Sequence, residues 1–171
     1  ALVQKLARLV SGLHAACLLL EAGFVQEQAV IQRVLDELAE DVAFLSFPSI
    51  FGEQSPLHEV YLKAFFQEEF DPSDESVSSS KRPMVRRHQI RAYIDKFASG
   101  PKGSSKNLDA SRTVSKTYSG YVHGASPQIM DMYGGNPPKF HVRGMSGTIR
   151  QMEHRADLWN YFYRTIIAFG F

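Results

Sequence analysis

The sequence contains a single cysteine, Cys17, among its 171 residues, so no disulfide can form within the chain. Because Cys17 lies in the apolar run Ala15–Leu20, we interpret it as a small buried hydrophobic residue rather than a nucleophile. This cysteine usage is typical of a reducing compartment, and we expect a cytoplasmic protein. No apolar run reaches the roughly 20 residues that span a bilayer, and no signal peptide is visible, so we expect no membrane partner.

The chain also lacks a strong excess of charge of either sign. Its 19 Lys and Arg residues stand against 18 Asp and Glu residues, and a net charge of +1 does not by itself direct a protein to nucleic acid. A phosphate-binding glycine loop, CxxC and HExxH are all absent, which excludes the common nucleotide, zinc and metalloprotease motifs. His123, His141 and His154 are scattered without a matching carboxylate pattern, so we expect no metal and no cofactor.

Helical periodicity is abundant. Apolar residues recur every three or four positions in 1–21 and again in 25–45, with Gly23 between them, which predicts two long helices joined as a hairpin. Ser55 is suited to cap a third helix and Pro56 to occupy its first position. A final helix is expected over Thr148–Ala168. The predicted fold class is therefore an all-α bundle of about five to six helices in one domain, residues 1–171, with at most one short β-hairpin near 139–143.

Four local features complete this prediction. Phe47-Pro48 should end the second helix, because proline cannot donate to the preceding turn, and His58 should be exposed on the third. Residues 71–80 and 99–105 should be the most mobile interior segments, since neither is rich enough in apolar residues to offset its ordering entropy. The core-facing stripe of the last helix is expected to consist of Met152, Ala156, Trp159, Tyr163 and Ile166. Because several helices carry apolar stripes wider than such a bundle needs, we also predict a homodimer.

The segment Arg112–Ala125 carries the strongest pattern of polar residues. On a helix, Arg112, Ser115, Ser119 and His123 share one side, and Ser119 and His123 are i,i+4 neighbours. Gly120 in mid-helix costs roughly 1 kcal/mol against alanine, which suggests a close approach by another backbone or a ligand. The competing interpretation is a solvated polar face.

A second polar pair lies on the second helix, where Arg33 precedes Glu37 by four positions. Most such pairs are surface salt bridges worth under about 1 kcal/mol, although the helix-stabilising order would place the acid first. The basic residues of a later helix, Arg86, Arg87, His88, Arg91 and Lys96, are interpreted mainly as a solvated face, with phosphate contact as the alternative.

Two segments together resemble a protein family. Residues His14–Leu45, with their Arg-x-x-x-Glu step, and Tyr118–Ser126, with their Ser-x-x-x-His step, are similar to a group of uncharacterised bacterial helical proteins near the HEPN-like family, which includes abortive-infection and toxin ribonucleases. This chain departs from the Arg-to-His spacing of the classical HEPN ribonuclease motif, because Arg112 precedes His123 by eleven positions and Arg150 precedes His154 by four.

This resemblance implies a HEPN-like helical domain that binds RNA or another phosphate-containing ligand, with metal-independent ribonuclease activity as the possible chemistry. We expect Arg33, Glu37, Ser119 and His123 to line one polar cleft as candidate catalytic residues, His123 being the general acid or base. Arg112, Ser115 and Tyr118 are candidate ligand contacts. The alternative is a non-catalytic helical interaction or scaffold protein of a defence or toxin-antitoxin system.

Overall fold

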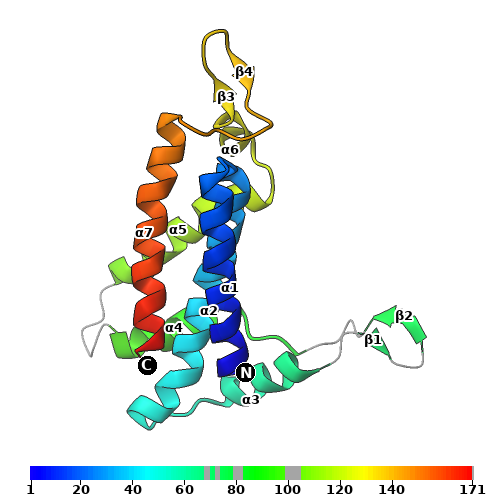
Figure 1. The fold of residues 1–171 in the computed structure, drawn as a ribbon. Helices are drawn as coiled ribbons and strands as arrows, with labels where there is room; N and C mark the ends of the chain where they lie inside the picture. The colour runs from blue at the N-terminus through cyan, green and yellow to red at the C-terminus, as the bar shows by residue number, and fades with distance from the viewer. Residues whose placement is uncertain (68–69, 72–73, 79–82, 99–104, 171) are drawn as a thin grey trace.

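The computed structural model describes residues 1–67, 70–71, 74–78, 83–98 and 105–170. Within these ranges the chain forms seven helices and two small antiparallel hairpins, so the predicted all-α fold is confirmed (Figure 1). The helices are α1 (Leu2–Glu21), α2 (Val25–Phe51), α3 (Pro56–Phe66), α4 (Arg87–Ala98), α5 (Ser105–Val122), α6 (Ser126–Met130) and α7 (Ile149–Phe169). The strands are β1 (Phe70–Asp71), β2 (Asp74–Ser78), β3 (Tyr133–Gly134) and β4 (Lys139–Phe140).

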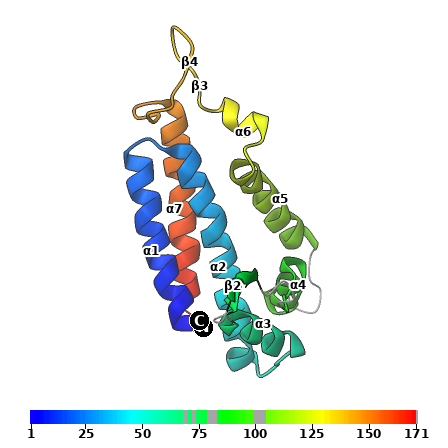
Figure 2. The ribbon, with the colours of Figure 1, turned by 90° about the vertical axis from the view of Figure 1, so that its right-hand side faces the viewer.

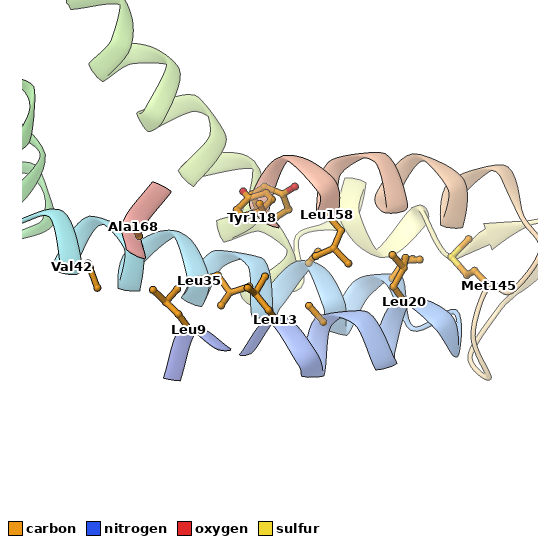
Figure 3. Close-up of a cluster of buried hydrophobic side chains, with 13 residues drawn as sticks. Leu9, Leu13, Leu20, Leu35, Val42, Tyr118, Met145, Leu158 and Ala168 are labelled. Carbon is orange, nitrogen blue, oxygen red and sulfur yellow. The ribbon is translucent and has the colours of Figure 1, made fainter. Parts of the chain in front are cut away.

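The core lies between the three long helices α1, α2 and α7, which stand side by side in Figures 1 and 2. The predicted hairpin of α1 and α2 turns at Gly23, and a Cβ on Gly12 would lie 2.7 Å from Leu35 Cδ2, so the two helices pack closely. Figure 3 shows the buried cluster, which includes Leu9, Leu13, Leu20, Leu35, Val42, Tyr118, Met145, Leu158 and Ala168. Among the described helices only α1 is long and apolar enough to cross a membrane by length and composition alone, and here its buried stripe packs against α2.

Helix α5 packs against α2, and a loop before α7 returns the chain to the α1–α2 turn. In that loop, Met145 N–H donates to the carbonyl of Gly23 at 2.7 Å. Gly23 has φ +81°, and a Cβ there would lie 2.4 Å from Ser146 N. The glycine is therefore required both by the turn and by the loop that crosses it.

Helix α2 does not end at Pro48, as the sequence predicted, but continues to Phe51. Pro48 has no N–H, so the carbonyl of Phe44 loses its helical donor. His58 of α3 supplies a replacement, since its Nε2 lies 2.9 Å from that oxygen, and its ring stacks on Phe44 at a centroid distance of 4.1 Å. The prediction that His58 is exposed was wrong: it is 3% exposed, and its Nδ1 accepts from Ser55 N–H in a capping box.

The two hairpins differ in how well the sequence predicted them. β3 and β4 pair Tyr133 with Phe140 and Gly134 with Lys139, close to the predicted position. Strands β1 and β2 lie where a flexible loop was predicted over 71–80, so that prediction was wrong for the described residues 71 and 74–78. The second predicted loop, 99–105, lies outside the described residues except for residue 105, which begins α5.

Helix α7 has nearly the predicted bounds but presents the opposite face to the core. The buried residues are His154, Leu158, Tyr161, Thr165 and Ala168. The large side chains of the stripe predicted to face the core, Met152, Trp159, Tyr163 and Ile166, are between 61% and 70% exposed. The stripe is real, but it faces solvent.

Candidate functional site

The predicted pair Arg33 and Glu37 forms an ion pair, with Arg33 Nη2 2.6 Å from Glu37 Oε1. Both side chains are half-buried rather than fully solvated. Glu37 Oε2 also lies 3.8 Å from Arg87 Nη2 on α4, and Arg87 Nη1 donates to the Glu37 carbonyl at 3.2 Å. The pair thus belongs to an interface between helices and not to an isolated surface.

This interface holds a network of seven ionised side chains, which we name the charge cluster: Lys5, Arg33, Glu37, Glu40, Asp41, Arg87 and Arg91. Asp41 is at its centre, with a side chain only 3% exposed, 2.7 Å from Lys5 Nζ and 2.5 Å from Arg87 Nη1. Arg91 Nε donates to Glu40 at 2.7 Å. The basic residues Arg87 and Arg91 therefore do not form the solvated face that the sequence predicted.

The electrostatics of the charge cluster follow from burial and pairing. Burial raises the pKa of Glu40, although the hydrogen bond and the charge of Arg91 oppose that shift. Burial alone would lower the pKa of Arg87, but the hydrogen bond and the charge of Asp41 outweigh it, and the pKa is raised. Removing one partner of such a buried pair typically costs about 3–5 kcal/mol, because the other charge is left uncompensated.

Hydrogen bonding in the charge cluster is incomplete. Arg33 Nη1 and Arg91 Nη2 are buried donors without a hydrogen-bond partner, and Glu40 Oε2 is a buried acceptor without one. Four cations stand against three carboxylates in the cluster. The cluster therefore holds its helices together, and its two unpaired N–H donors are enclosed by protein.

The residues predicted on α5 lie partly beside this cluster. Tyr118 packs edge-on against Tyr161 at 5.6 Å, and Tyr161 Oη donates to Asp36 of α2 at 3.1 Å. These contacts bring Tyr118 close to the level of Arg33 along α2. Ser115 and Tyr118 are buried and Ser119 is half-buried, so these three residues sit in the bundle rather than on a solvated face.

His123 does not join this group. Tyr121 packs on His154 at 5.9 Å, and His154 Nδ1 donates to Gln28 Oε1 at 2.9 Å, so Tyr121 lies level with Gln28. Glu37 is nine residues further along α2, a rise of about 13 Å, and His123 is exposed two residues beyond Tyr121 in the opposite direction. The structure therefore brings α2 and α5 together as predicted, but it does not form the predicted cleft with all four side chains.

Two further sequence expectations concern α5. Arg112 lies within this helix, but its side chain is outside the described residues. At Gly120 the sequence predicted the approach of another backbone or a ligand, but the neighbour is a side chain, because a Cβ there would lie 2.5 Å from Gln128 Cδ. Gln128 also accepts, through its carbonyl, a 2.6 Å hydrogen bond from Gln26 Nε2. The neighbour of Gly120 is thus a residue of α6, which ties α5 to the start of α2.

Sequence patterns did not identify the buried polar contact between α2 and α7. His154 is 4% exposed, and desolvation lowers its pKa. The position of His154 on the helix was the only hint in the sequence that this side of α7 is buried. Its partner, Gln28, is too distant in the sequence to be found from a local pattern. Among the described residues, no three His, Cys, Asp or Glu side chains gather as metal ligands would.

Large apolar side chains are exposed to solvent along α1 and α7. We define the α1–α7 face by six exposed residues: Val3 and Val10 of α1 and Met152, Trp159, Tyr163 and Ile166 of α7. Beside it, a pocket of about 310 Å³ is lined by Cys17, Leu20, Glu21, Arg155, Leu158, Trp159 and Phe162. Burial raises the pKa of the Cys17 thiol, and the charge of Glu21 adds to this shift, which does not favour a reactive thiolate.

Within the part of the chain that the structure describes, the charge cluster and the α1–α7 face are therefore the candidate functional surfaces. The charge cluster is mostly self-neutralised, whereas the α1–α7 face presents large apolar side chains to water. Comparisons with protein-family models, with curated proteins and with solved structures found no match.

Proposed function

We propose that this protein is a non-catalytic helical interaction protein that docks a partner on the α1–α7 face. One observation carries the proposal: the periodic apolar stripe of α7, with Trp159 at its centre, faces solvent while a different stripe fills the core. Soluble monomers rarely expose contiguous apolar patches above a few hundred Å² unless the patch is functional. Tryptophan and tyrosine are also the residues most enriched at the energetic centres of interfaces.

The size of the face supports a stable complex. If each side chain of this size offers on the order of 200 Å², the exposed fractions of the six residues correspond to roughly 800 Å². A standard protein interface buries about 800 Å² on each partner. The exposed side chains alone therefore approach the area that specific association needs.

The test is whether the face is an open apolar surface of a folded protein. We expect dilute wild-type protein to bind the apolar dye ANS, and Trp159→Lys and Ile166→Asp to lower that fluorescence severalfold with helical circular dichroism unchanged. Val142→Asp, which removes an apolar side chain 73% exposed on the loop after β4, is the matched control and should change little. Loss of helical structure in both face variants would contradict the proposal, because the stripe would then be part of the core.

Phosphate-ligand or RNA binding by a HEPN-like domain is a second candidate function, and the unpaired buried Nη1 of Arg33 favours it. Glu37 holds the guanidinium in place at 2.6 Å, and Tyr118 of α5 packs on Tyr161, which donates to Asp36, one turn beyond Arg33 on α2. Because Arg33 Nη1 is enclosed by protein, a phosphate oxygen would accept from it only after neighbouring side chains move aside; arginine is well suited to phosphate geometry.

Fluorescence anisotropy with a labelled single-stranded RNA in EDTA tests this second function. Arg33→Gln should weaken binding at least about tenfold, the loss expected for one charge-assisted hydrogen bond. His123→Ala should leave binding unchanged, because that ring is exposed and distant from Arg33. Equal affinity of wild type and Arg33→Gln for RNA would remove the second candidate.

A further inference from the structure

We infer that the partner on the α1–α7 face is a second copy of this chain, bound about a twofold axis that passes near Trp159 with the two α7 helices antiparallel. This inference rests on the proposed function and names the occupant of its surface. An isologous dimer needs a patch that is complementary to itself. The α7 stripe has this property.

The spacing of the stripe provides the first argument. Met152 and Ile166 each lie seven positions from Trp159, so an antiparallel pair centred on Trp159 places Met152 opposite Ile166 of the second copy. Both side chains are large, apolar and more than 60% exposed. The two ends of the stripe therefore bury each other, and the tryptophans meet at the axis.

The charges along the stripe provide the second argument and fix the direction. Arg155 and Phe162 both line the pocket on the α1 side of Trp159, four positions before it and three positions after it, so the antiparallel arrangement brings Arg155 close to the ring of Phe162 of the second copy. An arginine on a phenylalanine ring is a favourable cation–π contact. A parallel arrangement would place these two residues on opposite edges of the seam, where this contact cannot form.

The pocket beside the stripe provides the third argument. It carries Glu21 and Arg155, one charge of each sign, at an otherwise apolar site. A surface that carries one positive and one negative charge can pair each charge with the opposite charge of a second copy across a twofold axis. A strongly charged partner would instead need an excess of charge of one sign on this surface. The pocket also offers room for the edge of the tryptophan that approaches from the second copy.

The experiment combines mass measurement with cysteine cross-linking in the full chain carrying Cys17→Ala. Light scattering should give about twice the monomer mass of 19.2 kDa for the wild type at high concentration, and about 19.2 kDa for Ile166→Asp. The double variant Met152→Cys/Ile166→Cys should form a covalent dimer on mild oxidation. Met152→Cys alone should not, because its sulfur lies far from that of the second copy. Positions 152 and 166 are about 21 Å apart on one helix, so no bond can form within a chain.

Each other outcome is decisive. Cross-linking of Met152→Cys alone would show a parallel pair and overturn the register that we infer. A wild-type monomer at every concentration would overturn self-association. In that case, an ANS signal that still falls in the face variants would preserve the proposed function with a different partner, and an unchanged ANS signal would end both. A dimer that Ile166→Asp leaves intact would place the interface elsewhere.

Discussion

At the residue scale, His58 explains how α2 can pass through a proline. Its Nε2–H replaces the missing donor of Pro48 at the carbonyl of Phe44, while Nδ1 accepts from Ser55 N–H. When Nδ1 accepts from Ser55 N–H, the ring proton lies on Nε2 and points to the Phe44 carbonyl. One side chain thus satisfies two backbone groups and joins α3 to α2.

The first prediction concerns this pairing. His58→Ala should cost about 2–4 kcal/mol in urea unfolding, because it leaves a buried carbonyl unsatisfied and removes the stacking on Phe44. In a Pro48→Ala background the cost should be clearly smaller, since the substituted alanine has a backbone N–H of its own for the Phe44 carbonyl. Strictly additive costs in this double-mutant cycle would show that His58 does not replace the proline's missing donor.

A second residue-scale prediction concerns pH. Desolvation lowers the pKa of His154 in the folded protein. Below about pH 6.5, the ordinary pKa of histidine, the unfolded chain therefore binds a proton at this residue more readily than the folded chain does. His154 therefore lowers stability as pH falls from about 7.5 to about 5. The raised pKa of Glu40 acts in the opposite direction, stabilising the fold as pH falls. That effect is common to wild type and His154→Gln.

Urea unfolding of both proteins at the two pH values isolates the histidine. The free energy of unfolding should fall more in wild type than in His154→Gln, which keeps an amide donor for Gln28. Parallel changes in the two proteins would show that His154 is readily protonated in the folded state.

At the element scale, the turn between α1 and α2 depends on close packing by the loop before α7. Gly23→Ala should be more destabilising than Gly52→Ala by about 1–3 kcal/mol. Both glycines have positive φ, +81° and +71°, so an alanine at either position is destabilised by a similar backbone strain. Only the Cβ at 23 meets another segment, whereas nothing lies within 4 Å of a Cβ at 52. Equal losses in thermal or urea unfolding would mean that the loop does not press on this turn.

The two faces of α7 give a further element-scale prediction. Leu158→Ala, on the buried face, should cost about 2–5 kcal/mol. Met152→Ala, on the exposed face, should change the stability of dilute protein by no more than about 0.5 kcal/mol. If Met152→Ala were the more costly of the two, the helix would be rotated relative to the structure described above.

Helix α7 also shows how far the sequence determines the fold. Its bounds follow from periodicity, as do those of α1 and the cap of α3. Its orientation does not, because the buried stripe includes the polar residues His154 and Thr165, while the exposed stripe is the more hydrophobic one. Contacts between distant segments fix the buried side, among them the hydrogen bonds of His154 to Gln28 across 126 positions and of Tyr161 to Asp36, which no local pattern contains.

The same limit applies to the candidate site. The sequence identified Arg33 and Glu37 because they are one turn apart on a single helix. It missed the roles of Arg87 and Asp41, which meet only when α4 packs on α2. His123 was wrongly grouped with Glu37, since helical spacing fixes the face of a residue but not its level along a neighbouring helix.

At the scale of the whole molecule, the exposed surface is large. The accessible area is 10915 Å², whereas a folded monomer of 19.2 kDa is expected to expose about 8,400 Å². The hairpins that project in Figure 1 and the exposed apolar residues of α1 and α7 both contribute to this area. Covering those apolar residues with a second copy would bring the chain closer to the surface expected for its size.

The most direct test uses Trp159, which is the only tryptophan in the chain and lies at the centre of the α1–α7 face. Its fluorescence emission and acrylamide quenching should be measured over a dilution series, with Ile166→Asp as the reference for an uncovered face. In a dimer that covers Trp159, emission at high protein concentration should be of short wavelength and poorly quenched, and on dilution it should shift to long wavelength and become readily quenched. Wild-type emission that matches Ile166→Asp at every concentration would contradict this prediction.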